Sequence, residues 1–157
     1  MKWIFLSILI VYTVHLSGCA STKLYSSSLQ DNIAITTRAD ADSAFSSVNI
    51  FLDIYEVNRA CATKFLGSVK LYETKTLVGL PVNKNSYLSF RFVGSSFLGG
   101  SSSSTSFDTL LKPLKGYEYE IHARYVKGIY NVDILERRGA KGRKHRIESR
   151  ELNQCRR

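Results

Sequence analysis

Histidine is scarce in this chain of 157 residues: there are three, and only His122 and His145 lie beyond residue 18. A Ser-His-Asp hydrolase needs a histidine base within reach of its nucleophile, and no Gly-x-Ser-x-Gly elbow is present to hold a serine. The acids Asp108, Glu118 and Glu120 are scattered and show no sign of an acid/base pair. The sequence therefore predicts no catalytic residue and a non-enzymatic protein.

Motifs for metals, phosphates and nucleic acids are also missing. The histidines have no spacing that gathers them near a cysteine, which argues against a metal site. Gly94 and Gly99-Gly100 lie in a serine-rich stretch without a following helix, so they form no phosphate-cradling loop. No recognition helix or base-stacking platform is evident. We therefore expect no metal, no cofactor and no nucleic-acid partner.

Long apolar runs are absent except near the start, where Trp3–Val14 is broken only by Ser7 and Thr13. A membrane-spanning helix needs about 20 apolar residues, so this run is too short to cross comfortably. It follows the positive Met1-Lys2 and leads into small residues, an order typical of a secretory signal. An uncleaved signal anchor is the alternative.

The run Leu16–Cys19 (Leu-Ser-Gly-Cys) resembles the lipobox of bacterial lipoproteins. The resemblance implies that Cys19 is lipidated, that residues 1–18 are removed, and that several acyl chains anchor the protein; two or more chains make a stable anchor. Ala20 stands where aspartate signals inner-membrane retention in Gram-negative lipoproteins. The resemblance therefore implies a lipid-anchored protein on the periplasmic face of the outer membrane.

Two cysteines, Cys61 and Cys155, remain after Cys19. Because an oxidising compartment favours disulfides, an even remaining pair is interpreted as a bridge. Such a bridge would hold the C-terminal tail near the end of the strand expected at 47–56. Two free buried thiols are the alternative.

Positive charge is concentrated at the C-terminus. Residues 137–157 hold nine Lys and Arg against Glu148 and Glu151, a charge of +7, whereas the whole chain carries +9. A basic cluster favours polyanions, which for a secreted lipoprotein means anionic lipid, lipopolysaccharide or an acidic envelope protein. The residues predicted to contact an anionic surface are Arg137, Arg138, Lys141, Arg143, Lys144 and Arg146. A solvated edge that only maintains solubility is the alternative.

The pattern of the chain predicts strands, most of them beyond residue 46. Two prolines, nine tyrosines and eight phenylalanines suit a β-rich domain, and apolar residues alternate at period two. The expected strands are 47–56, 65–72 (with Phe65, Val69 and Leu71 on one side) and 87–93, with short ones at 32–37, 76–80 and 107–111. We expect residues 47–157 to form one all-β domain, an antiparallel β-sandwich that is immunoglobulin-like or transthyretin-like.

A hairpin is the clearest element. Lys127-Gly128 is the expected two-residue turn, which pairs Val126 with Ile129 and sets the rest of the register. Apolar pairs then share one face: Tyr125 with Tyr130, Ala123 with Val132, and Ile121 with Ile134. Polar pairs share the other: Arg124 with Asn131, His122 with Asp133, and Glu118 with Arg137. A surface ion pair between His122 and Asp133 is expected.

Three segments are expected to be irregular or are ambiguous. Residues 19–46 are predicted to be a tether between lipid and domain. Gly94–Ser106 is mostly serine and glycine and is predicted to be a mobile loop, either a tolerated insertion or a finger that presents Phe97 and Leu98 to a partner. Residues 146–154 fit a short helix or a last strand.

The run from Phe107 to Ile121 is similar to one in small proteobacterial envelope lipoproteins, where a strand, a Pro and Gly turn and a Tyr-rich strand follow one another. That resemblance implies a sandwich and an envelope role. We therefore expect an accessory or binding component of the cell envelope. An enzyme acting on envelope polymers is the alternative, followed by an inhibitor of a secreted hydrolase.

Overall fold

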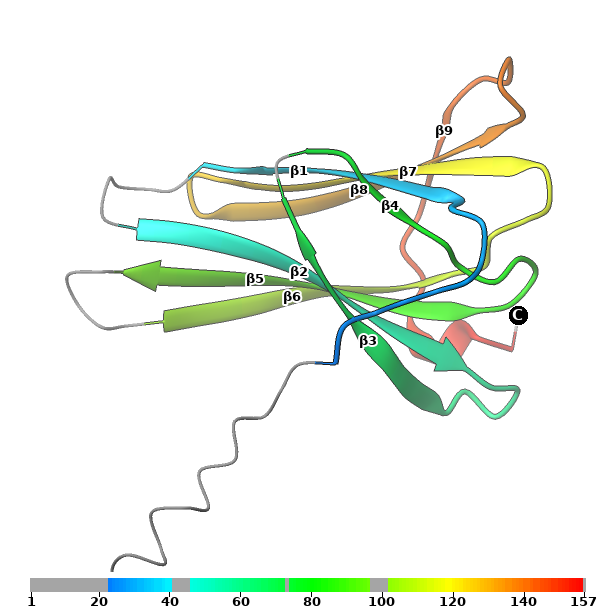
Figure 1. Cartoon of the computed structure of the whole chain (residues 1–157), viewed down its shortest axis with the longest axis horizontal. Coiled ribbons are helices and arrows are strands. Elements are labelled where there is room, and N and C mark those ends of the chain that lie inside the picture. The colour runs from blue at the N-terminus through cyan, green and yellow to red at the C-terminus, as the bar shows by residue number, and fades with distance from the viewer. Residues whose placement is uncertain (1–22, 41–45, 73, 97–101, 157) are drawn as a thin grey trace, which may run out of the picture.

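The computed structural model describes residues 23–40, 46–72, 74–96 and 102–156. Within these ranges nine strands form two sheets that pack face to face (Figure 1). The strands are β1 (Ile33–Ala39), β2 (Ser46–Val57), β3 (Thr63–Leu71), β4 (Thr76–Val78), β5 (Ser86–Ser96), β6 (Ser102–Leu111), β7 (Tyr117–Val126), β8 (Ile129–Arg138) and β9 (His145–Ile147). The expected all-β sandwich is confirmed.

The core lies between a four-stranded sheet, in the order β3-β2-β5-β6, and a five-stranded sheet, in the order β4-β1-β7-β8-β9. Alternating residues of β2 and β5 point into it, among them Leu52, Ile54 and Phe90. Ile35 and Ile121 cover them from the other sheet, where β1 and β7 run parallel. Sequence alternation predicted the strands, but the parallel pairing of β1 with β7 was not expected.

The β7–β8 hairpin has the predicted register at every pair, from Val126 and Ile129 to Glu118 and Arg137. Lys127 and Gly128 both have positive φ, 50° and 75°. Two central residues with positive φ are the requirement of a type I′ turn, whose twist matches that of the flanking strands. The local sequence therefore determines this hairpin by itself.

The predicted tether at 19–46 is wrong over much of its length, because the described chain is part of the domain from Lys23 onward. Ser68 N–H donates to the Lys23 carbonyl (2.8 Å), and Tyr25 N–H donates to the Ser68 carbonyl (2.9 Å). The Tyr25 hydroxyl donates to the Gly79 carbonyl at 2.6 Å. The strand β1 then lies inside the five-stranded sheet, with Ile35 fully buried. Because residues 20–32 are mostly polar, the sequence did not indicate these backbone pairings.

A register shift in β3 overturns the expected position of Phe65. The pairing with β2 slips between Ile54, which lies opposite Gly67, and Tyr55, which lies opposite Phe65. An extra residue in one strand, a β-bulge, moves the following side chains to the other face. Val69 and Leu71 share the inner side, as predicted, whereas Phe65 lies outside against the Tyr55 ring, with centroids 5.2 Å apart.

The predicted loop at Gly94–Ser106 is mostly strand. β5 continues to Ser96 and β6 begins at Ser102, with Gly94 opposite Ser103. Backbone hydrogen bonds between β5 and β6 stabilise the hairpin without burial of apolar side chains, so a serine-rich sequence still forms strands. Phe97 and Leu98, predicted as contact residues, lie outside the described residues.

The C-terminal segment combines both of its expected forms: His145–Ile147 is strand β9, and Leu152–Gln154 is a short 3₁₀ helix. Between them, Arg150 binds β6, since its carbonyl accepts from Leu110 N–H at 2.8 Å. The predicted disulfide between Cys61 and Cys155 is present, with Cα atoms 5.8 Å apart. It joins the tail to the turn between β2 and β3, as the sequence predicted.

Candidate functional site

The outer face of the five-stranded sheet carries most of the ion pairs of the described residues and is called here the charged face. Its side chains come from β1, β7 and β8, where alternate residues point away from the core, and from the chain around β9, which folds back beside β8. The charged face consists of Thr36, Glu118, Glu120, His122, Arg124, Asp133, Arg137, Lys144 and Arg146. Cross-strand pairing sets the positions of these side chains, so their arrangement follows from the register of the strands.

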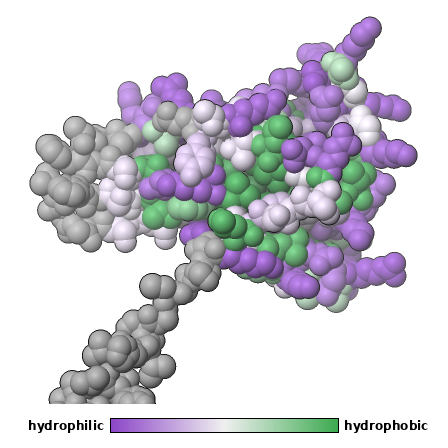
Figure 2. Space-filling model, viewed as in Figure 1, coloured by the Kyte–Doolittle hydropathy of each residue, from purple (hydrophilic) through white to green (hydrophobic). Residues whose placement is uncertain are grey.

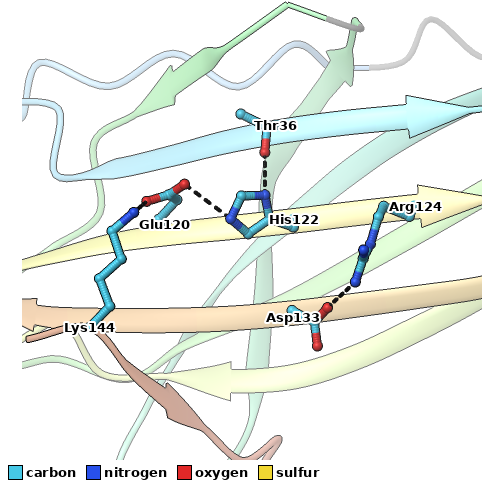
Figure 3. Close-up of polar contacts among 6 residues, drawn as sticks. All are labelled: Thr36, Glu120, His122, Arg124, Asp133 and Lys144. Carbon is cyan, nitrogen blue, oxygen red and sulfur yellow. Dashed lines mark hydrogen bonds and ion pairs between the residues drawn. The ribbon is translucent and has the colours of Figure 1, made fainter.

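A line of four polar groups crosses the charged face (Figure 3). Thr36 Oγ1 lies 2.7 Å from His122 Nδ1, and His122 Nε2 lies 3.0 Å from Glu120 Oε1. Because a carboxylate only accepts hydrogen bonds, Nε2 carries a proton. Lys144 Nζ donates to the other oxygen of Glu120. That hydrogen bond, with the nearby charges of Lys144, His122 and Lys75, holds the pKa of Glu120 below its ordinary value.

The expected ion pair between His122 and Asp133 is not the contact that forms, although the two residues are opposite in the register. His122 instead binds Thr36 and Glu120. Asp133 pairs with Arg124 and, at 2.6 Å, with Arg146. The arginines reach the carboxylate from a neighbouring position on β7 and from β9, and charge-assisted hydrogen bonds between guanidinium and carboxylate are about twice as strong as neutral ones.

Half of the predicted anionic-contact residues already have acidic partners. Arg137 pairs with Glu118, Lys144 with Glu120, and Arg146 with Asp133. The chain around β9 lies beside β8, which brings these cations to the acids of the charged face. The remaining three, Arg138, Lys141 and Arg143, lie in or next to the β8–β9 loop, are exposed, and have no acidic partner among the described residues. We call these three the loop cations.

A groove of about 810 Å³ lies at the end of the charged face where β7 begins. Its apolar lining includes Leu29, Leu77, Leu80, Val82, Leu114 and Leu135. Figure 2 shows apolar surface among charged residues on the side of the domain that carries β1 and β4. Lys75, Lys115, Asp31 and Glu136 also line the groove, so both signs of charge border it. The sequence did not indicate this groove, since its walls come from distant segments.

The outer face of the other sheet holds one polar contact that the sequence did not indicate. Asp53 is only 6% exposed, and its carboxylate accepts hydrogen bonds from Ser68 Oγ and Arg91 Nε. The Arg91 guanidinium also lies over the Phe51 ring, 5.3 Å from its centroid. Asp53 lies on the outer face of β2, and the burial of its carboxylate follows from its neighbours on β3 and β5.

Cys19, the predicted lipidation residue, lies outside the described residues. Among the residues that are described, no helix has the length and hydropathy of a membrane span. No group of three or more His, Cys, Asp and Glu side chains within those ranges is placed to hold a metal ion.

Comparison with known proteins gives no further guidance to the function of these surfaces. No model of a protein family matches the chain, and no curated protein matches it either.

Proposed function

We propose that this protein is a lipid-anchored, non-enzymatic binding component of the bacterial cell envelope, on the periplasmic face of an outer membrane. The lipobox resemblance of Leu16–Cys19 supports the anchor. The observation that supports binding is that three cations of the basic segment are paired with acids, whereas the loop cations Arg138, Lys141 and Arg143 have no acidic partner among the described residues. The partner class is a phosphate- or carboxylate-bearing envelope component: anionic lipid, lipopolysaccharide or an acidic protein.

The anchor makes the first prediction. Replacing Cys19→Ser removes the thiol that would carry the lipid, so the variant should incorporate no radiolabelled palmitate and should keep its signal peptide. Labelling and gel mobility measure this, with Cys61→Ser as the matched control that removes a different thiol and should label normally. Palmitate incorporation by Cys19→Ser at the level of the unaltered protein would refute the anchor.

The loop cations make the second prediction. The chain 20–157 without lipid should bind phosphatidylglycerol vesicles but not phosphatidylcholine vesicles, and salt should weaken the binding. Each cation near an anionic surface contributes about 1 kcal/mol. Replacing Arg138, Lys141 and Arg143 by glutamine should therefore lower the vesicle partition coefficient by on the order of 100-fold, measured by sedimentation.

The control for the loop cations removes the same charge elsewhere. Arg59, Lys84 and Arg156 are exposed and lie away from the β8–β9 loop. Replacing these three by glutamine should change the partition coefficient much less. An equal loss in both variants would show that only net charge matters, which is the solvated-edge alternative.

An enzyme is the second candidate, because Thr36, His122 and Glu120 align a hydroxyl, an imidazole and a carboxylate beside the groove. Two observations rank it lower. Glu120 is also paired with Lys144. The strand β7 has a partner on each side, so its N–H groups bond to neighbouring strands and are not available as an oxyanion hole. Hydrolysis of a nitrophenyl ester that is lost in Thr36→Val and retained in Thr37→Val would favour the enzyme.

A further inference from the structure

Residues 23–25 lie at an edge of the sandwich, where they are attached to β3. Lys23 and Tyr25 exchange backbone hydrogen bonds with Ser68 at 2.8 and 2.9 Å. The phenol of Tyr25 reaches across to the carbonyl of Gly79, between β4 and β5. The segment 23–25 is therefore a fixed part of the domain.

If Cys19 carries the lipid, four residue steps separate the anchor from Lys23. An extended chain covers at most about 3.6 Å per residue, so Lys23 lies within about 14 Å of the lipidated cysteine. The expected tether of 28 residues would have let the domain move freely above the membrane. The short connection holds the edge formed by 23–25 and β3 next to the anchoring leaflet.

This edge exposes apolar and cationic side chains together. Leu24 is 75% exposed and Tyr72 is 60% exposed, although both are large apolar or aromatic side chains. Lys70 and Tyr72 lie close together, with Lys70 Nζ 5.6 Å from the ring centroid, and Lys23 is exposed beside Leu24. Tyrosine is enriched at membrane–water interfaces, and lysine is attracted to anionic headgroups. We call Lys23, Leu24, Lys70 and Tyr72 the β3-edge patch.

We propose that the β3-edge patch lies on the surface of the anchoring leaflet, with Leu24 and Tyr72 in the interface and Lys23 and Lys70 at anionic headgroups. This inference rests on the proposed lipidation of Cys19. Its two supports are the length of the chain between Cys19 and Lys23 and the composition of the patch, which matches a lipid surface in charge and in polarity.

The loop cations then face away from that leaflet. β1, at the β4 side of its sheet, packs near β3, whereas Arg150, after β9, binds Leu110 of β6. The strands β3 and β9 therefore lie at opposite edges of the sandwich, as Figure 1 shows. Three strand spacings from β3 to β6 amount to about 14 Å, beyond the Debye length of about 8 Å at physiological salt. In the anchored protein the loop cations are thus available to an anionic partner other than the anchoring leaflet, whereas the domain without lipid is free to turn them toward an anionic vesicle.

Single-tryptophan variants test the docking. The only tryptophan is Trp3, in the predicted signal peptide, so the mature protein has none. Lipidated Leu24→Trp and Tyr72→Trp, reconstituted in phosphatidylglycerol–phosphatidylcholine vesicles, should show blue-shifted emission and quenching by brominated phosphatidylcholine. The control His145→Trp, on exposed β9, should show neither. Unquenched emission at 24 and 72, or equal quenching at 145, would overturn the proposal.

The same samples separate the two proposals. Flotation with vesicles and the mass of the protein report the lipid independently of quenching. Protein that carries no lipid would refute the anchor and the docking together. Protein that carries lipid and floats, but whose tryptophans at positions 24 and 72 are unquenched, would refute only the docking. The docking alone would likewise be refuted if a second copy of the chain, instead of lipid, covered these tryptophans.

A glycine substitution tests the role of the short connection. A Cβ atom on Gly67 would lie 2.6 Å from Tyr25 Cα, so Gly67→Ala should displace the segment 23–25 from β3. The next attachment is Asn32, whose side chain binds the backbone of Leu80 at 2.8 and 2.9 Å. Tyr72→Trp in this background should keep its lipid and lose its quenching. Faster amide exchange at Tyr25 would show that segment 23–25 has been released. If quenching is unchanged while the segment is released, the short connection is not what holds the patch at the membrane.

Discussion

Replacing both bridging cysteines, Cys61→Ala with Cys155→Ala, should lower the free energy of unfolding by up to about 4–5 kcal/mol. The bridge closes a loop with a sequence separation of 94 residues, and long loops lose the most entropy when they are closed in the unfolded chain. Domains of this size have a stability of about 5–15 kcal/mol, so the loss is a large share. Denaturant titration measures it.

The reduced protein provides the control for the disulfide. Reducing agent should destabilise the unaltered protein by a similar amount and leave the double variant unchanged. In the double variant the hydrogen bond from Asn85 Nδ2 to the Cys155 carbonyl, 2.8 Å long, should also be lost, and amide exchange should increase over residues 150–156. Equal stability of the reduced and oxidised protein would contradict the role assigned to the bridge.

Phe90→Ala should cost about 3–5 kcal/mol, the range for removing a fully buried phenylalanine. Phe90 is 0% exposed on the central strand β5, and its ring contacts Phe107 with centroids 6.5 Å apart. Leu52, opposite Phe90 on β2, and Ile121 of the other sheet belong to the same buried cluster, so the void would lie between the two packed sheets. Thermal and denaturant unfolding measure the loss.

Phe65→Ala is the matched control, because it removes the same atoms from the outer face. Phe65 is 37% exposed, and its ring packs against the Tyr55 ring, so its removal should cost about 1–2 kcal/mol. A cost equal to that of Phe90→Ala would place Phe65 inside the core, which would mean that β3 continues without the bulge.

Alternation in the sequence was sufficient for most strands and for one complete register. The pattern from Tyr117 to Arg138 alternates apolar and polar residues around Lys127-Gly128, and a one-residue slip would bury the charges. Apolar pairs and opposite charges therefore agree on a single register, and the structure has it. The disulfide was likewise predictable, since Cys61 and Cys155 were the only thiols left once Cys19 was assigned to the lipid.

Long-range placement could not be read from the sequence. The parallel pairing of β1 with β7 joins residues more than 80 positions apart, and nothing local encodes it. Phe65 was predicted on the same side of its strand as Val69 and Leu71, because the composition of a strand does not reveal a bulge that exchanges its faces. The charge of the basic segment was correctly located, but its pairing was not: Lys144 meets Glu120 only because the chain turns back along β8.

Local sequence thus determined the strands and the β7–β8 turn, because period-two alternation and turn chemistry depend on residues close together in the chain. The disulfide was determined by elimination, from the number of cysteines. Only the tertiary structure decided which cations of the basic segment have acidic partners among the described residues, where the groove lies and how close Lys23 is to β3. Those features depend on contacts between segments that are distant in the chain, and each contact forms only after the two sheets have packed.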